Sequence, residues 1–449
     1  MAKKKQIELT IEEKLQNALV PKEEQPYKIP SNWCWIRLEN IAEWGSGGTP
    51  SRKRKEYYNG NIPWIKTGEL NNGYIFNSEE KITELGLKNS SAKLYPINTV
   101  IIAMYGATIG KVGILSIEAT TNQACACAIV YKNILFKYVF HYLIYQKEAF
   151  INKSKGGAQP NLSQEIIKKH EIPLPPLNEQ QRIVNIIESL FAKLDRAKEL
   201  IENTLAQFEQ NKMAILHKAF TGELTAKWRK ENNIDLSSWE KIKLGKVLLP
   251  MQTKKPTGQF FRYIDIDAID NKRQIVKAPK LILTEKAPSR ASRGVETGNI
   301  LFSMVRPYLK NIAQIDSDLS DCIASTGFYV CRCKPELNSR FLYYLFIFDK
   351  TIDYLMQFMK GDNSPSIRKD DLLNMKIDLP TIEEQQEIVN ILDKLLAKYN
   401  KIKNLEQQLE KIELLKKAIL AKAFRGELGT NNPDEESAEN LLKEILAEK

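Results

Sequence analysis

Two Cys-x-Cys pairs carry the thiols that could hold a metal ion: Cys125 with Cys127, and Cys331 with Cys333. As alternate residues of a strand, both thiols of a pair would point to one face. A structural zinc ion needs four ligands, and no histidine lies near either pair; the three are His141, His170 and His217. The pairs are also one residue out of register with the internal repeat described below. We predict buried strand cysteines and no metal site.

A glycine-rich segment at residues 106–112, GATIGKV, superficially resembles a phosphate-binding loop. It is one residue shorter than G-x-x-x-x-G-K, and Val112 stands where that motif has a magnesium-binding hydroxyl. The glycines more simply form a turn between two strands. Residues 174–177, LPPL, lack the acidic or amide residue and the aromatic of an amino-methyltransferase motif, and no G-x-G-x-x-G opens a helix. We therefore predict no catalytic centre.

Basic side chains interleaved with aromatic and amide groups are the remaining candidates, and they suit DNA. Arginine or lysine can bridge O6 and N7 of guanine, and asparagine or glutamine can bridge adenine, although most basic residues in a footprint contact phosphate. In the first half the candidates are Arg52, Lys53, Arg54, Lys55, Tyr57, Lys66, Lys111, Lys155 and Gln159. In the second half they are Lys254, Lys255, Arg273, Arg290, Arg293, Arg306, Tyr308 and Lys310. A solvated run of surface charge is the alternative for any single cluster.

The elements that must position these residues come in two copies. Residues 179–186 read EQQRIVNI and residues 384–391 read EQQEIVNI, while AILHKAFTGEL at 214–224 matches AILAKAFRGEL at 418–428. GGAQP at 156–160 faces GDNSP at 361–365, and Trp33 and Trp239 open the two copies. The offsets of 204 to 206 residues hold over nearly the whole of each copy, so the chain is a duplicated domain with its connector.

Each copy ends in a long helix, predicted at about residues 178–220 and 383–424, where Gly and Pro are absent. Asn178 and Thr381 are the predicted N-caps, and Gly222 and Gly426 lie where the helices stop. An apolar residue recurs every three or four positions: Ile183, Ile187, Leu190, Leu194, Ala197, Ile201, Leu205 and Phe208, then Ile388, Ile391, Leu395, Ile402, Leu405, Leu409, Ile412 and Leu415. Each helix could pack on its own domain, but the matched lengths favour an antiparallel coiled coil of the two.

The predicted fold class is therefore α/β, with two similar domains in tandem that each combine short strands, turns and a connector helix. The predicted boundaries are a helical segment at 1–30, recognition domains at 31–177 and 223–380, spacer helices at 178–222 and 381–426, and a tail at 427–449. Antiparallel helices would place the domains at opposite ends of a rod with a pseudo-twofold axis. Helical segments near 11–19 and 438–446 would join the rod near the first domain.

Composition narrows the partner. The net charge of +11 and pI near 9.0 favour an anionic partner, nucleic acid before a membrane surface. Hydrophobic residues at 43% and charged residues at 27% exclude wholesale disorder. The basic start lacks the apolar run of a signal peptide, and no apolar stretch reaches membrane-spanning length. Six cysteines without a secretion signal indicate reduced thiols in the cytoplasm.

Together the motifs resemble the specificity subunit of type I restriction–modification enzymes along essentially the full length. In the first domain they are GGTPS (47–51), IPWIKTGEL (62–70), MYGATIGKVG (104–113) and TNQA (121–124). In the second they are APSRASRG (287–294), LFSMVRPYLKN (301–311) and IASTGF (323–328), and the Pro–helix–GEL connector occurs twice. The resemblance implies that each domain reads one half of a split, asymmetric target in double-stranded DNA, and that the coiled coil sets the spacer.

The resemblance also implies that this chain is not an enzyme. Methyl transfer from S-adenosylmethionine would belong to modification (methyltransferase) subunits, two of which dock on the coiled coil, and ATP- and Mg²⁺-dependent translocation and cleavage to restriction subunits. This chain would then carry no cofactor. Three alternatives stay open: a specificity chain of a methyltransferase-only system, a self-contained DNA methyltransferase or nuclease, and a coiled-coil scaffold whose charge is incidental.

Overall fold

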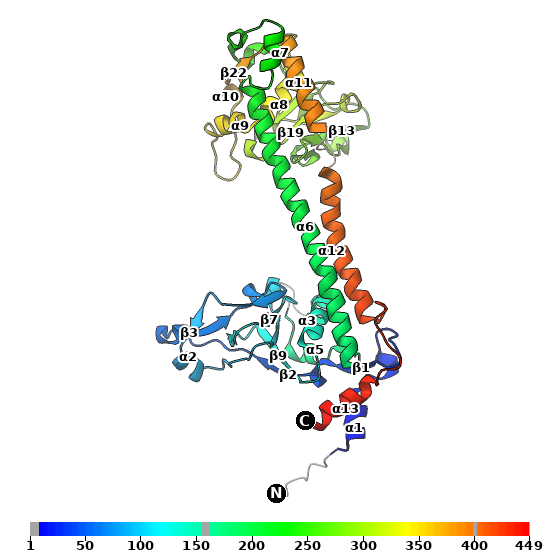
Figure 1. The fold of residues 1–449 in the computed structure, drawn as a ribbon. Helices are drawn as coiled ribbons and strands as arrows, with labels where there is room; N and C mark the ends of the chain where they lie inside the picture. The colour runs from blue at the N-terminus through cyan, green and yellow to red at the C-terminus, as the bar shows by residue number, and fades with distance from the viewer. Residues whose placement is uncertain (1–8, 155–160, 398–401, 449) are drawn as a thin grey trace. The chain divides into compact units, whose positions relative to one another are not determined.

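The computed structural model describes residues 9–154, 161–397 and 402–448, which divide into two compact units. Unit 1 comprises Met1–Glu199 and Gln407–Lys449, and unit 2 comprises Leu200–Glu406. The long helices are shared between them. The helix α6 (Leu177–Phe220) starts in unit 1 and ends in unit 2, α11 (Ile382–Ala397) lies in unit 2, and α12 (Ile402–Phe424) ends in unit 1 (Figure 1).

Unit 1 contains sheets of order β2-β9-β6-β7-β4, β5-β3-β8 and β1-β10. The strands are β1 (Cys34–Arg37), β2 (Ala42–Ser46), β3 (Tyr58–Ile65), β4 (Gly73–Ile75), β5 (Lys81–Ile82), β6 (Val100–Ala103), β7 (Val112–Leu115), β8 (Thr120–Thr121), β9 (Cys125–Val130) and β10 (Glu171–Leu174). The other helices are α1 (Ile11–Ala18), α2 (Glu84–Lys88), α3 (Phe136–Tyr145), α4 (Lys147–Lys153), α5 (Gln164–Lys168) and α13 (Ala438–Glu448).

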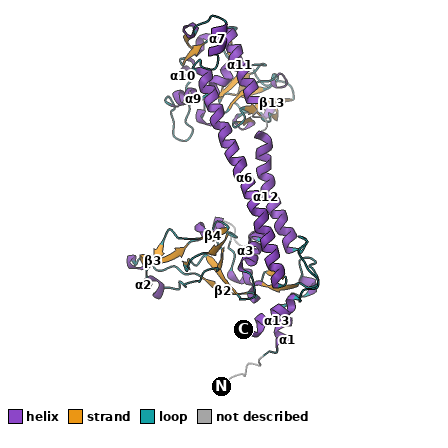
Figure 2. Ribbon diagram, viewed as in Figure 1, coloured by secondary structure: helices purple, strands orange, loops and turns teal. Residues whose placement is uncertain are grey.

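Unit 2 repeats this plan with sheets of order β12-β21-β18-β19, β16-β13-β20-β17, β11-β22 and β14-β15. The strands are β11 (Glu240–Lys243), β12 (Leu248–Leu249), β13 (Phe260–Ile264), β14 (Ile269–Asp270), β15 (Ile275–Val276), β16 (Lys280–Leu283), β17 (Ala291–Gly294), β18 (Ile300–Ser303), β19 (Ile312–Gln314), β20 (Ile323–Ser325), β21 (Phe328–Cys333) and β22 (Lys376–Leu379). The helices are α7 (Ala226–Glu231), α8 (Ser339–Ile347), α9 (Asp349–Met356) and α10 (Lys369–Leu373), besides α11 (Figure 2).

The central strands are buried on both faces, which explains their continuous apolar runs. In β6, Val100 and Ile102 pack in the same core as helix α3, whereas Ile101 and Ala103 enter a second core on the other face. In β18, Ile300 and Phe302 likewise face the helices and Leu301 faces away. The mixed α/β prediction and the duplicated domain are confirmed at the level of strand order.

The paired cysteines lie in strands, as predicted, and Cys125, Cys127 and Cys331 are buried while Cys333 is half-buried. Cys125 and Cys127 point to the face of β9 away from the helices, and Cys331 and Cys333 point to the helix face of β21. Cys127 pairs with Ile101 as Val330 pairs with Leu301, so the cysteines of β21 are displaced by an odd number of residues and occupy the opposite face of the equivalent strand. Burial raises the pKa of Cys127 and of Cys333 to about 12. In the described ranges, no three His, Cys, Asp or Glu side chains gather as metal ligands.

The connector helices pair antiparallel within unit 1. Lys198 of α6 meets Glu413 of α12 at 3.1 Å, and Asp195 meets Lys416 at 2.5 Å, so the partner number falls as the α6 number rises. Leu415, placed in the predicted apolar stripe, is instead 50% exposed. The second predicted helix corresponds to α11 and α12, and residues 398–401 between them lie outside the described residues.

The helix ends follow the sequence signals with one exception. Gly222 and Gly426 have φ of +81° and +72° just beyond α6 and α12, the left-handed conformation that terminates helices. Thr381 caps α11, because its Oγ1 accepts from the Glu384 amide at 3.4 Å. The predicted cap Asn178 is wrong, since α6 already begins at Leu177, after Pro176. Pro176 is the residue just before the helix, and its carbonyl accepts from the Gln180 amide at 3.0 Å.

The predicted terminal helices are both present in unit 1. Leu15 and Ala18 of α1 share a core with Leu442 and Ile445 of α13. These side chains lie in the same core as Ile183 near the start of α6. None of the helices in the described ranges combines the length and apolar character needed to span a membrane.

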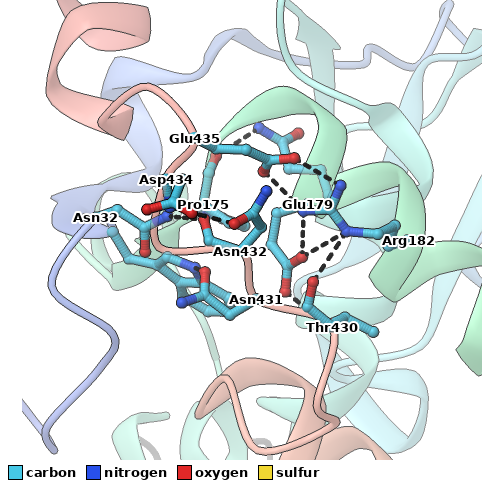
Figure 3. A network of polar contacts seen from close by, with 11 residues as sticks. Asn32, Pro175, Glu179, Arg182, Thr430, Asn431, Asn432, Asp434 and Glu435 are labelled. Atoms are coloured by element: carbon cyan, nitrogen blue, oxygen red, sulfur yellow. Dashed lines mark hydrogen bonds and ion pairs between the residues drawn. The ribbon is translucent and has the colours of Figure 1, made fainter.

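The start of each connector helix is held by a buried glutamate, and Figure 3 shows the contacts of the one in unit 1, Glu179. In unit 1, Glu179 accepts from the Thr430 hydroxyl at 2.5 Å and pairs with Arg182 at 2.8 Å, and Arg182 also pairs with Glu435 at 2.6 Å. Burial raises the pKa of Glu179 against the opposing hydrogen bonds from Thr430 and Arg182, while Arg182 lowers the pKa of Glu435. The segment after α12 therefore fixes the first turn of α6.

Unit 2 repeats this arrangement with the helices exchanged. Glu384 of α11 accepts from the Thr225 hydroxyl at 2.6 Å and from Arg229 at 2.5 Å, and Trp239 donates to it at 2.9 Å. Glu384 is fully buried and the Arg229 side chain is only 8% exposed. The segment after α6 therefore fixes the first turn of α11.

Candidate nucleic-acid interface

Three chain segments of unit 1 meet at one edge of its sheets. The β6–β7 loop, residues 104–111, joins the turn at residues 121–124 where the Met104 amide donates to the Ala124 carbonyl at 2.8 Å. That turn joins the end of β3, where the Asn122 amide donates to the Ile65 carbonyl at 3.0 Å. The segment after β3 reaches β7, where the Val112 amide donates to Oδ1 of Asn72 at 3.0 Å. We call residues 66–72, 104–111 and 121–124 the loop edge of unit 1.

The same edge exists in unit 2 with equivalent hydrogen bonds. The Met304 amide donates to the Gly327 carbonyl at 2.9 Å, as the Met104 amide does to Ala124. The Ile367 amide donates to the Met304 carbonyl at 3.0 Å, as the Leu162 amide does to the Met104 carbonyl in unit 1. The Thr326 amide donates to the Arg290 carbonyl at 2.9 Å. Residues 265–271, which follow β13, join the same loop where Asn271 donates to the Leu309 carbonyl at 3.0 Å. The loop edge of unit 2 therefore comprises residues 265–271, 304–310, 325–327 and 361–366, with Arg290 at its border.

Arg52 and Lys66 are both tied to one carboxylate in unit 1. Glu80 pairs with Arg52 at 2.7 Å and with Lys66 at 2.9 Å, and these two hydrogen bonds lower the pKa of Glu80. The Arg52 guanidinium also lies 4.5 Å from the ring centre of Tyr58 and 4.9 Å from that of Trp64. Stacking and ion pairing together fix the direction of this arginine.

The rest of the basic run is less constrained. Arg54 pairs only with the neighbouring Glu56, at 3.3 Å, and Lys53 and Lys55 are exposed. Tyr57 is half-buried at the end of this run, and its carbonyl accepts from the Thr83 amide at 3.0 Å. These residues precede β3 and lie apart in sequence from the loop edge, which holds Lys111. Lys155 and Gln159 lie outside the described residues.

Unit 2 gathers its basic residues in two places. Lys254 lies beside β17, because its amide donates to the Ser292 carbonyl at 3.1 Å and the neighbouring Thr253 bridges to Arg293. Arg290 directly precedes β17, so Lys254, Lys255, Arg290 and Arg293 form one cluster. Arg306 and Tyr308 form the second cluster, on the β18–β19 loop.

Two predicted contacts in unit 2 have protein partners. Lys310 donates to the Ile347 carbonyl at 3.1 Å and pairs closely with Asp349. Arg273 pairs with Glu406 at 3.4 Å and lies in a turn whose Asn271 donates to the Leu309 carbonyl at 3.0 Å. Lys310 thus ties the β18–β19 loop to α8 and α9, and the turn that carries Arg273 contacts the same loop through Asn271. Contact of Lys310 and Arg273 with DNA, like that of the other candidates, stays a prediction.

The two edges differ in charge at equivalent positions. Lys66 directly follows β3 and pairs with Glu80, whereas Asp265 directly follows β13 and pairs closely with Lys280. The hydrogen bond that Lys280 donates to Asp265 raises the pKa of Lys280. The equivalence follows from the parallel pairings, since Ile65 aligns with Thr121 and Ile264 with Ala324. A common backbone therefore presents a cation in one unit and a carboxylate in the other.

Several side chains that organise these edges were missed from sequence. Glu80 and Trp64 hold Arg52, while the carbonyls of Asn363 and Pro365 hold Arg306. The only available signal was the alignment of GGAQP at 156–160 with GDNSP at 361–365, which marks an equivalent loop in both copies. The predicted turn at residues 106–111 is confirmed, with Gly106 and Gly110 both in the left-handed region.

Both halves of the chain match one known protein family. The family model described as "Type I restriction modification DNA specificity domain" matches twice, at residues 30–207 and 239–414. The specificity subunit of the type I restriction enzyme MjaIX from Methanocaldococcus jannaschii is 26% identical over 89% of this chain and 94% of its own length. That of EcoR124I/EcoR124II from Escherichia coli is 34% identical, but over only 34% of this chain and 40% of its own length.

The fold agrees with a solved structure. A chain of a solved structure, described as "Structural basis underlying complex assembly and conformational transition of the type I R-M system", superposes on this chain with a TM-score of 0.68 at 21% identity. The match covers 90% of this chain and all of that one. The two family matches cover most of the chain and coincide with the two copies of the sheet plan, so this chain belongs to the type I restriction–modification DNA specificity family.

Proposed function

We propose that this chain is the sequence-reading subunit of a type I restriction–modification complex, in which each loop edge reads one half of a split DNA target. One observation carries the proposal: the same loop edge is built twice on the same hydrogen-bonded backbone but presents different side chains, Lys66 against Asp265 and Gly106 against Arg306. Two different reading surfaces on one chain fit a target whose halves differ.

The connector helices set the distance between the two half-sites in this proposal. A DNA groove returns to the same face once per helical turn, about 34–36 Å, and a helix of 44 residues such as α6 has a length of roughly 66 Å. Antiparallel pairing of α6 with α12 within unit 1 supports a stiff connector.

Catalysis belongs to partner subunits. Two modification subunits dock on this chain and carry S-adenosylmethionine, and restriction subunits carry ATP and Mg²⁺, so this chain itself holds no cofactor. The two matches to a DNA specificity domain support this recognition role.

Selection from a random duplex library tests the proposal. The complex of this chain with its modification subunits is incubated with the library, and the retained DNA is sequenced. We expect two unlike short motifs at a fixed separation, with affinity that falls steeply as salt rises because phosphate contacts release counterions. Retention without any preferred sequence would contradict the proposal.

A further inference from the structure

Backbone strain is concentrated in one part of unit 2. Among the described residues, seven non-glycine residues have positive φ, and four of these are asparagines, which tolerate it. The other three are Gln274, Arg306 and Lys310, with φ of 53°, 48° and 50°. They lie in two turns joined by the hydrogen bond from Asn271 to the Leu309 carbonyl. Strain of this kind persists where the surroundings impose it and gathers at functional sites.

The equivalent loop of unit 1 solves the same backbone problem with glycine. Gly106 and Gly110, with φ of 66° and 74°, correspond to Arg306 and Lys310, since Met104 and Met304 make the same hydrogen bonds just before them. A side chain at Gly106 would meet nothing within 4 Å. Glycine would therefore serve the loop of unit 2 without strain, and the two long cations need another reason to be there.

The reason for Lys310 is visible in the fold. Its ammonium reaches back to the Ile347 carbonyl and the Asp349 carboxylate, so it fastens the β18–β19 loop to α8 and α9. It is a structural anchor.

Arg306 instead contacts the segment at residues 361–366. It is exposed, its amide is fixed by the Pro365 carbonyl at 2.8 Å, and one guanidinium nitrogen donates to the Asn363 carbonyl at 2.8 Å. The guanidinium has five N–H donors, and that single bond orients it while leaving others for a ligand. Tyr308 stands beside it, 42% exposed.

We infer that Arg306 is a base-reading residue of unit 2, and that its guanidinium bridges O6 and N7 of one guanine in that unit's half-site. The inference rests on the proposed function and names the residue that carries it out. The strained loop, fixed at Arg306 by the carbonyls of Asn363 and Pro365, holds the guanidinium in one direction before DNA arrives. Such preorganisation favours a base contact, which needs a fixed direction, over a phosphate contact, which does not.

Two variants separate reading from support. Arg306→Gly removes the guanidinium and the strain together, so we expect the thermal unfolding midpoint to stay the same or rise while one G·C position in one half-site loses its preference. Lys310→Met removes the anchor, so we expect a lower midpoint with the sequence preference of the retained DNA unchanged. Lys241→Met, an exposed site on β11, serves as the control.

The measurement is library selection by the complex with its modification subunits, together with thermal unfolding of the same preparations. An unchanged preference in Arg306→Gly would overturn the inference, as would a general loss of binding with a lowered midpoint, which marks a structural arginine. If the unmodified chain selects a split target and Arg306→Gly selects the same one, only the inference fails. If the unmodified chain selects nothing, the proposed function fails.

Discussion

Glu384 at the start of α11 accepts a 2.6 Å hydrogen bond from Thr225, which follows the end of α6. Glu179 at the start of α6 accepts the corresponding bond from Thr430, which follows the end of α12. Each connector helix is thus held at its start by the chain that leaves the other one. The two sites differ in the arginine: Arg229 is almost fully buried, whereas Arg182 is partly exposed and also pairs with Glu435.

This difference predicts unequal stability losses. Glu384→Ala leaves Arg229 buried without its carboxylate, and we expect a loss of about 3–5 kcal/mol in the free energy of unfolding. Glu179→Ala leaves Arg182 with Glu435, and we expect a smaller loss. Chemical denaturation of both variants beside Thr225→Val, with an expected loss of about 1 kcal/mol, checks the order. Equal losses for the two glutamates would contradict it.

The buried histidines of unit 1 predict acid sensitivity. Burial lowers the pKa of His141 and of His170 to about 4, from 6.5. Below pH 6.5 these histidines become protonated in the unfolded chain but stay neutral in the folded unit. The free energy of unfolding is therefore highest above pH 6.5 and decreases as the pH falls towards 4, by up to about 3 kcal/mol for each histidine.

A variant isolates the contribution of His141. Both of its ring nitrogens are buried without a hydrogen-bond partner among the described residues, and its ring packs edge-on to Phe191. We expect His141→Phe to be as stable as the parent at pH 7 and to flatten the decline in stability below pH 6.5. Denaturant titrations at pH 4.5, 5.5 and 7, with the exposed His217→Gln as control, decide this. An unaltered decline would mean that other groups cause it.

Arg290 predicts a one-sided effect on recognition. It is exposed at the border of the loop edge of unit 2. If it reads a base, Arg290→Ala reduces discrimination at one position of one half-site by about 1–3 kcal/mol; if it contacts phosphate, it weakens all sequences alike. Competition binding with DNA changed in either half distinguishes these outcomes, and Lys241→Ala is the control. An equal loss of base discrimination in both half-sites would refute separate reading surfaces.

The connector predicts the spacing of the two half-sites. Removing seven residues, two helical turns, from both α6 and α12 shortens each by about 10 Å. At roughly 3.4 Å per base pair, we expect a spacer about three base pairs shorter, with both half-site sequences unchanged. Selection from a library of varied spacer lengths measures this. An unchanged spacer would rule out the helices as the measure of distance.

Local signals in the sequence were enough for the scaffold. The repeated EQQ and GEL segments and the stops at Gly222 and Gly426 determine where the connector helices begin and end, because each signal acts within a few residues. The second connector is described as α11 and α12. Strand cysteines followed from alternation in the same way. Asn178 was wrongly predicted as the N-cap because the helix already begins at Leu177, directly after Pro176.

The site was less predictable because its side chains are positioned by distant partners. Nothing near Arg52 or Lys66 in sequence shows that Glu80 would bind both, or that Asp349 would anchor Lys310. The equivalence of Gly106 and Arg306 was also hidden, since the two loops share hydrogen bonds and backbone conformation rather than residue types. Divergence is greatest where the proposed reading surfaces lie.

The most direct measurement of the central claim is a map of modified bases in DNA from cells that express this chain with its modification subunits. The two unlike loop edges predict one recurrent motif made of two different short halves, separated by a fixed number of unspecified base pairs. Modified sites in a single uninterrupted motif, in two identical halves, or without any common sequence would contradict the account.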